Sequence, residues 1–320
     1  MSKILNIVDL KKYYNSKDGI VKSLDGIDIS LKKGEVIGII GESGCGKTTL
    51  AKCLIGIEDR TAGEIYFRDQ SIDELKKDRL KYRKMCQMVF QNPYDVFDNK
   101  MKIGEILDKT LRVHKIGTSK ADRLDKISYS LRDAGFDEPL NYLDRYPKEL
   151  SGGQLQRLSI IRSQLLDPEI IILDEPVSML DVSIRADIIN LLIKISEQRG
   201  VSMIFISHDI STISFLASKI YVMYLGKVVE YGPTSLVLKN PAHPYTRALI
   251  SHMASIDPNH KINPIKIKGE VPKPIDQGPG CYFYKRCFAC IQRCICEYPP
   301  FIEVDENRYI SCFNPQLLYK

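Results

Sequence analysis

The stretch that most constrains the fold is residues 41–49, GESGCGKTT, which fits the phosphate-binding pattern G-x-x-x-x-G-K-[ST]. Its glycines let the backbone adopt conformations closed to residues with a Cβ, so that successive N–H groups can point at phosphate oxygens. An apolar run, 36–40, precedes this phosphate loop, and apolar residues at helical spacing follow it over 50–57. The loop should therefore open a helix whose N-terminus favours an anion. This context predicts a protein that binds a nucleoside triphosphate.

Each residue type in the phosphate loop has an expected role. Lys47 supplies a flexible positive charge for the β- and γ-phosphates, and Thr48 offers a hydroxyl to Mg²⁺. Thr49 is expected to offer another hydroxyl to phosphate. The residues whose backbone is expected to contact the nucleotide are Gly41, Ser43, Gly44 and Gly46.

Composition narrows the class of protein and its compartment. The net charge of +6 suits an anionic membrane surface or nucleic acid, but no tract of consecutive Lys or Arg marks a nucleic-acid patch. No run reaches the roughly 18 apolar residues of a membrane span, and the N-terminus lacks an apolar signal-peptide core. We expect a cytosolic protein, either soluble or peripheral to a membrane. Nine cysteines in such a chain argue against a disulfide scaffold, and six of them lie between Cys281 and Cys312.

The order of elements predicts an α/β core with additions. Alternating apolar residues over 4–8 and 23–31 predict antiparallel strands near the N-terminus. Helical periodicity with many charges over about 93–165 indicates a helical insertion. The apolar runs 220–224 and 227–231 flank Leu-Gly and predict a hairpin, and loop-forming composition follows residue 232.

The stretch 170–175, IIILDE, predicts a buried parallel strand that ends in two carboxylates. Asp174 lies at the carboxyl end of that strand, where ligands of open α/β sheets bind, and can hold Mg²⁺ through water. Glu175 follows, where a general base can activate a water. Alone, the pair would be two exposed acids at a strand end; beside an intact phosphate loop, the catalytic interpretation is favoured.

Other polar residues stand at the ends of predicted elements. Ser151 can cap a helix that begins near Gln154, and Gly152-Gly153 leaves N–H groups exposed there, which makes a second anion site. Either the chain binds two anions, or this second site acts on a partner's nucleotide. Gln91 and His208 each follow an apolar strand; His208 is a candidate for contact with the γ-phosphate. Tyr13 and Tyr14 can stack on an adenine ring or fill the core.

Together, and in this order along residues 1–232, these motifs resemble the ATP-binding subunit of ABC transporters. The resemblance implies an ABC-type P-loop ATPase of the α/β class. Its core would be a mixed sheet, with an antiparallel β arm, the helical insertion at about 93–165 and a Cys-rich extension at 233–320. The stretches 174–178, 224–230 and 243–249 resemble the oligopeptide/dipeptide importer branch, and within it the second of two ATPase subunits.

The resemblance assigns roles to the residues already singled out, with ATP and Mg²⁺ as cofactors. Tyr14 would stack on adenine, with Tyr13 as the alternative register. The candidate catalytic residues are Lys47, Gln91, Glu175 and His208, and those for Mg²⁺ are Thr48, Gln91 and Asp174. The signature residues Ser151, Gly152, Gly153 and Gln154 would contact ATP bound to the opposite subunit of a head-to-tail dimer.

The implied partners are a second, distinct ABC ATPase, two transmembrane permease subunits and an extracytoplasmic solute-binding protein, with no nucleic acid. The chain would lie peripherally on the cytoplasmic face of the cell membrane and drive uptake of oligopeptides or dipeptides. Nickel or another small solute is the alternative cargo. A soluble ABC ATPase of DNA repair or translation is disfavoured, because the chain has neither a long coiled-coil insertion nor a repeated signature.

The C-terminal cysteines are a separate question. Clustered thiols in a cytosolic chain suggest a metal rather than disulfides. Resemblance to the peptide-importer tail selects Cys281, Cys287, Cys294 and Cys312 as ligands of an iron–sulfur cluster or Zn²⁺, which leaves Cys290 and Cys296 as extra residues. The remaining alternative is a small subdomain with reduced, unliganded thiols.

Overall fold

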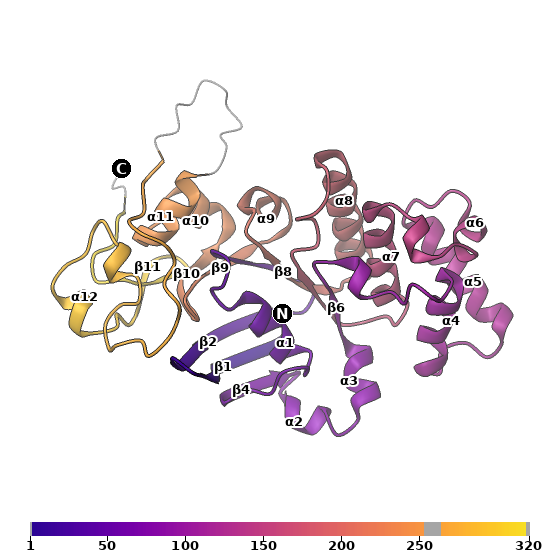
Figure 1. Cartoon of the computed structure of the whole chain (residues 1–320), viewed down its shortest axis with the longest axis horizontal. Helices are drawn as coiled ribbons and strands as arrows, with labels where there is room; N and C mark the ends of the chain where they lie inside the picture. Colours follow the sequence, from indigo (N-terminus) through magenta and orange to yellow (C-terminus); the bar gives the residue numbers. More distant parts are fainter. Residues whose placement is uncertain (1, 253–263, 318–320) are drawn as a thin grey trace. The chain divides into compact units, whose positions relative to one another are not determined.

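The computed structural model describes residues 2–252 and 264–317, and the chain forms two compact units (Figure 1). The first unit consists of Met1–Ile72 and Phe205–Lys320, and the second is Asp73–Ile204. Within the predicted extension 233–320, residues 253–263 and 318–320 lie outside the described part.

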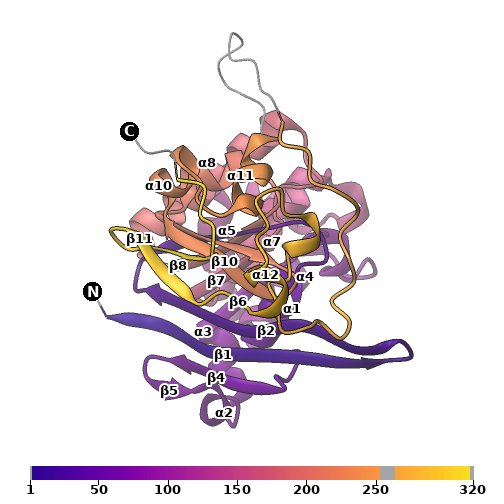
Figure 2. The same cartoon turned by 90° about the vertical axis from the view of Figure 1, so that its left-hand side faces the viewer.

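An antiparallel sheet forms the N-terminal arm of the first unit, in the strand order β2-β1-β4-β5 (Figure 2). Its strands are β1 (Lys3–Ser16), β2 (Gly19–Lys32), β4 (Ala62–Phe67) and β5 (Gln70–Ser71). Apolar residues such as Leu5 and Leu31 lie opposite each other and are buried, as the alternating pattern predicted. Both strands extend beyond the predicted runs, because residues 11–16 pair with residues 19–25 and continue the same hairpin.

A second, mixed sheet in the first unit carries the phosphate loop. β3 (Val36–Ile40) is fully buried and pairs in parallel with β9 (Lys219–Tyr224). β9 forms the predicted hairpin with β10 (Lys227–Pro233); Leu225 and Gly226 turn the chain with φ of 43° and 78°. The helices of this unit up to residue 251 are α1 (Lys47–Leu54), α9 (Ile210–Leu216), α10 (Thr234–Lys239) and α11 (Pro244–Ser251).

The second unit contains a parallel strand pair and the predicted helical insertion. β6 (Cys86–Val89) pairs in parallel with β7 (Ile170–Asp174), and β8 (Ser202–Ser207) crosses from this unit into the first. The helices of this unit, the first of which begins at its boundary, are α2 (Ile72–Leu75), α3 (Arg79–Met85), α4 (Ile103–Val113), α5 (Lys120–Asp133), α6 (Pro139–Leu143), α7 (Gly152–Gln164) and α8 (Val182–Arg199).

The helical insertion has its own apolar core. On α4, buried residues recur at Ile103, Ile106, Leu107 and Leu111, the spacing of one helix face. They pack with buried residues of α5 and α7 and with Phe136. The mixed sheet, the β arm and the helical insertion are therefore all as the sequence predicted.

The C-terminal segment adds two strands to the mixed sheet. β12 (Arg308–Ser311) pairs antiparallel with β10, and β11 (Phe301–Asp305) pairs with β12. Before them lie a short 3-10 helix, η3 (Tyr284–Arg286), and α12 (Arg293–Cys296). The sheet thus continues across residue 232; the domain boundary at that position stays a prediction.

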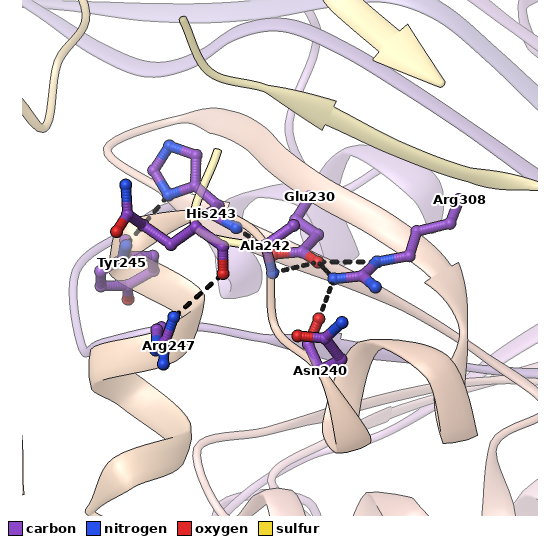
Figure 3. A network of polar contacts seen from close by, with 8 residues as sticks. Glu230, Asn240, Ala242, His243, Tyr245, Arg247 and Arg308 are labelled. Atoms are coloured by element: carbon purple, nitrogen blue, oxygen red, sulfur yellow. Dashed lines mark hydrogen bonds and ion pairs between the residues drawn. The ribbon is translucent and has the colours of Figure 1, made fainter. Parts of the chain in front are cut away.

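A buried ion pair fastens β12 to β10 (Figure 3). Arg308 Nη2 lies 2.6 Å from Glu230 Oε1, and the two side chains are 1% and 0% exposed. The Glu230 carboxylate also accepts the N–H groups of Ala242 at 3.1 Å and His243 at 2.9 Å, while Arg308 donates to the Asn240 carbonyl. Because every charged group has a partner, the burial of this pair is tolerated.

Glu230→Ala is expected to lower the free energy of unfolding by about 3 to 5 kcal/mol, because it leaves the Arg308 charge buried without a counter-ion. Denaturant unfolding of the full chain measures this change. The matched control is Glu297→Ala, which removes a carboxylate from the exposed pair with Arg293 and should cost about 1 kcal/mol or less. Equal costs for the two variants would show that the buried pair does not brace the extension.

Candidate functional site

The phosphate loop connects β3 to α1 and takes its shape from close backbone packing. Gly46 has φ of 105°, and a Cβ on it would lie 2.3 Å from the Ser23 carbonyl oxygen. A Cβ on Gly41 would lie 2.2 Å from the Met223 carbonyl oxygen. Real Cβ atoms do not approach so closely, so glycine is required at both positions. The arm and β9 therefore fix the two ends of the phosphate loop.

The side chain of Lys47 contacts the start of the phosphate loop. It is buried, and its Nζ donates to the carbonyl oxygens of Gly41 at 2.7 Å and Glu42 at 3.1 Å. Thr48 is exposed, while the Thr49 hydroxyl accepts a hydrogen bond from Ser23 at 2.8 Å. The ammonium group is thus held by carbonyl oxygens of the phosphate loop itself.

The two candidate adenine-stacking residues lie on β1 but have different surroundings. The Tyr13 hydroxyl donates a hydrogen bond to the Asp25 carboxylate. Tyr14 lies beside the phosphate loop: burial raises the pKa of its phenol, and a hydrogen bond with Thr49 acts in the opposite direction. The Nζ of Lys12 lies 4.7 Å from the Tyr14 ring centroid. Of the two tyrosines, Tyr14 is the one with a contact to the phosphate-loop residue Thr49.

In the second unit, the parallel pairing of β6 and β7 brings two predicted site residues together. Val89 lies opposite Leu173, and Gln91 and Glu175 each follow two residues later. Gln91 Nε2 donates to Glu175 Oε2 at 3.2 Å, a contact between residues 84 positions apart in the sequence. Glu175 adopts φ of 47°, which turns the chain sharply after the buried Asp174.

Ser178 completes this group. Its hydroxyl donates to the Glu175 carbonyl oxygen at 3.0 Å and lies 3.5 Å from Gln91 Nε2. The Glu175 backbone and side chain are thus both held by neighbours within the second unit. A carboxylate fixed in this way is suited to orienting a water.

The signature residues begin α7 as a capping box. Ser151 Oγ accepts the Gln154 N–H at 3.3 Å, and Gln154 Oε1 accepts the Ser151 N–H at 3.0 Å. The two glycines between them differ. A Cβ on Gly153 would lie 2.5 Å from Ile184 Cγ2, whereas a Cβ on Gly152 would lie 3.8 Å from its nearest neighbour. Packing against α8 therefore explains Gly153 without any ligand, and Gly152 leaves room for one.

Two apolar side chains stand exposed beside the signature loop. Met179 is 64% exposed and Val182 is 80% exposed, on either side of the residue that caps α8, Asp181. His208, the last predicted catalytic residue, follows β8 at the surface of the first unit. The predicted site residues thus belong to both units: the phosphate loop, Tyr14 and His208 to the first, and Gln91, Asp174, Glu175 and the signature to the second.

Comparison with known proteins decides the family. Residues 24–178 match the family described as "ABC transporter", and residues 229–294 match "Oligopeptide/dipeptide transporter, C-terminal region". The dipeptide transport ATP-binding protein DppF of Haemophilus influenzae is 39% identical, over 97% of this chain and 96% of that protein. DppF of Escherichia coli is 40% identical, over 98% and 96%. This chain belongs to the ABC transporter family.

Solved structures agree with this assignment. The cbiO1 protein of Clostridium perfringens, part of the ABC transporter complex cbiONQ, has a TM-score of 0.65 at 28% identity and covers 75% of this chain and 92% of its own. A dimeric structure of the ATP-binding cassette MJ0796, bound to ADP and Pi, has a TM-score of 0.64 at 27% identity, with coverage of 72% and 98%. The chain is accordingly an ABC-type ATPase subunit that uses ATP and Mg²⁺. None of the helices described here is both long and apolar enough to span a membrane.

The C-terminal cysteines of this ABC subunit lie near one another but do not form a ligand group. Burial raises the pKa of the Cys281 thiol to about 12, and the charges of Cys294, Cys312 and Cys287 act in the same direction. Burial also raises the pKa of Cys287, to about 11. Within 2–252 and 264–317, no three His, Cys, Asp or Glu side chains come together closely enough to hold a metal ion.

Two contacts of this extension were not predicted from the sequence. Arg286, between Cys281 and Cys287, pairs with Glu42 of the phosphate loop. Tyr282 donates to Asp25, the carboxylate that Tyr13 also contacts. Burial raises the pKa of Asp25, but these two hydrogen bonds and the Lys227 charge outweigh it, so the net shift is downward. The segment around Tyr282 and Arg286 has no hydrophobic periodicity from which contacts with Asp25 and Glu42 could be predicted. Its one unusual feature in the sequence is an arginine between two cysteines.

Proposed function

We propose that this chain is the ATPase subunit of an importer for oligopeptides or dipeptides. The observation that carries the proposal is the match of residues 229–294 to the C-terminal region of oligopeptide/dipeptide transporters. That region is present in addition to the ABC match, and the DppF relatives named for dipeptide transport align over nearly the whole chain.

In this proposal, the phosphate loop and Lys47 bind the phosphates of ATP, and Tyr14 stacks on adenine. Thr48, Gln91 and Asp174 would hold Mg²⁺, directly or through water. Glu175 is the general base, and its hydrogen bond with Gln91 supports this role because it fixes the carboxylate beside the Mg²⁺ ligand. His208 would hold the γ-phosphate.

The signature Ser151–Gln154 would serve ATP bound to a second ABC ATPase, in a head-to-tail dimer. Two observations support this partner. The room next to Gly152 leaves the N-terminus of α7 open to a ligand. The exposed Met179 and Val182 offer apolar surface beside the signature, as expected where another chain covers it.

The remaining partners follow from the transport function. An ABC importer ATPase works with membrane-spanning permease subunits, and we propose two of these together with an extracytoplasmic solute-binding protein. The chain would then lie on the cytoplasmic face of the cell membrane, held there by the permeases.

Uptake measurements test the cargo. A strain that lacks this chain should lose uptake of a labelled dipeptide or a longer peptide, and the natural chain should restore it. Lys47→Ala should fail to restore it, because ATP binding requires the ammonium group. Nickel uptake measured in the same strains distinguishes the alternative cargo: loss of nickel uptake with unchanged peptide uptake would contradict the proposal.

For the extension, we propose a metal centre held by Cys281, Cys287, Cys294 and Cys312, either an iron–sulfur cluster or Zn²⁺. The mutual electrostatic influence of these thiols supports the choice, and thiolates are the ligands that both centres use. As they stand, the four thiols are not arranged as a ligand set, so loading would require them to move closer together.

Protein purified without oxygen should be brown and should contain iron and acid-labile sulfide, both lost in Cys287→Ser. Cys296→Ser is the control, because Cys296 is exposed and lies outside the proposed set. Colourless protein with bound zinc would select the zinc centre. Protein free of both metals would contradict the proposal and leave a subdomain with reduced thiols.

A further inference from the structure

Glu42 is a residue of the phosphate loop whose backbone and side chain both have partners outside the loop. Its carboxylate pairs with both terminal nitrogens of Arg286: Nη1 lies 2.7 Å from Oε2, and Nη2 lies 3.1 Å from Oε1. Its N–H donates to the hydroxyl of Tyr245 at 2.8 Å, and its carbonyl accepts Lys47 Nζ. The backbone and the side chain of Glu42 are thus fixed together.

Arg286 is buried and has a second hydrogen-bond partner besides Glu42. Its side chain is 8% exposed, and Nη1 also donates to the Tyr224 hydroxyl at 3.3 Å. Phe283, one turn earlier, packs against the rings of Tyr224 and Tyr245 with centroids 5.1 and 5.4 Å apart. A fork-shaped guanidinium that binds both carboxylate oxygens fixes direction as well as distance, which a lysine cannot do.

From this arrangement we propose that Arg286 is a positioning residue for ATP binding. The loop contains three glycines with positive φ, so ordering it around phosphates costs conformational entropy. A contact that already holds Glu42 in place reduces that cost, which is how preorganisation raises affinity. The extension thereby contributes to ATP affinity without touching the nucleotide.

The same arrangement connects the cysteines to the phosphate loop. Arg286 ends η3, and this turn lies between two of the proposed metal ligands: the Tyr284 N–H donates to the Cys281 carbonyl at 3.0 Å, and the Cys287 N–H to the Tyr284 carbonyl at 3.3 Å. A change in the separation of those two cysteines would therefore rotate or shift Arg286.

The inference rests on the proposed role of the phosphate loop, so the experiment tests both. Equilibrium titration of the full chain with ATP and Mg²⁺ gives Kd, calorimetry gives Tm, and ATPase assays of the assembled transporter give KM and kcat. Arg286→Met and Glu42→Gln should each raise Kd and KM for ATP about tenfold, within the usual range of coupling between sites. The kcat at saturating ATP should stay within about twofold, because the reacting groups are untouched.

Three further variants make the result specific. Arg286→Lys keeps the charge but not the fork, so its Kd should lie between those of the natural chain and Arg286→Met. The double variant Arg286→Met/Glu42→Gln should bind no more weakly than either single variant, because both remove one interaction. Lys285→Met removes the neighbouring exposed cation of the same turn and should leave Kd unchanged.

The outcomes separate the two ideas. If Lys47→Ala binds ATP like the natural chain, the phosphate-loop assignment itself is wrong. If Lys47→Ala loses binding but Arg286→Met lowers only Tm and leaves Kd unchanged, Arg286 is a structural brace and this inference is overturned. Additive effects in the double variant would overturn it as well.

Discussion

E175Q protein is expected to bind ATP normally and to hydrolyse it at least about 100-fold more slowly, the lower range for loss of a general base. Glutamine keeps the shape of Glu175 and can still hydrogen-bond to Gln91, but it cannot accept a proton from water. The closed dimer should accumulate, because ATP remains bound between the subunits. Steady-state ATPase assays of the assembled transporter and an ATP-binding titration measure the two quantities.

The control for this variant is Glu197→Gln, an exposed glutamate of α8 outside the proposed site, which should leave turnover unchanged. Near-natural turnover in Glu175→Gln would show that another group takes the proton. Loss of ATP binding would instead show that Glu175 supports the nucleotide site structurally.

Gly152→Asp is expected to abolish transport while leaving ATP binding at this chain's own phosphate loop intact. The new carboxylate would stand at the N-terminus of α7, where the proposed dimer places the partner's ATP, and would repel its phosphates. Gly153 is the wrong position for this test, because any Cβ there collides with Ile184. The measurements are peptide uptake by the intact transporter and ATP binding by the isolated full chain.

Gly278→Asp is the matched control, since a Cβ at Gly278 would meet nothing within 4 Å. It adds the same charge to the same chain and should permit transport. If Gly152→Asp loses ATP binding at its own phosphate loop, the signature acts within one chain and the head-to-tail arrangement is wrong.

Site residues could be predicted from the sequence where the chemistry of the site sets their type and spacing within one short segment. The phosphate loop requires glycines, a lysine and a threonine at fixed spacing, and the acidic strand requires an apolar run before its carboxylates. The contact between Gln91 and Glu175 could not be predicted, because it depends on the register of β6 against β7. Once Val89 is known to lie opposite Leu173, the contact follows.

The extension was the least predictable part for the same reason. Its composition indicates loops, and loops place side chains by tertiary contacts rather than by period. Three side chains of the extension contact carboxylates more than 70 residues away in the sequence. Arg286 contacts Glu42, Tyr282 contacts Asp25, and Arg308 contacts Glu230. Nothing in the local sequence distinguishes these three from solvent-exposed polar residues.

These three carboxylates also limit how such a subunit can be recombined with its relatives. A chimera whose segment after residue 232 carried other side chains in place of Arg308, Arg286 and Tyr282 would remove these partners from Glu230, Glu42 and Asp25. The first change leaves a buried charge without its counter-ion. The second removes the guanidinium from the phosphate loop, and the third removes one of the hydrogen bonds to Asp25. The parts of the chain before and after residue 232 are therefore coupled through three contacts, and a substitution in one member of a contact changes the surroundings of the other.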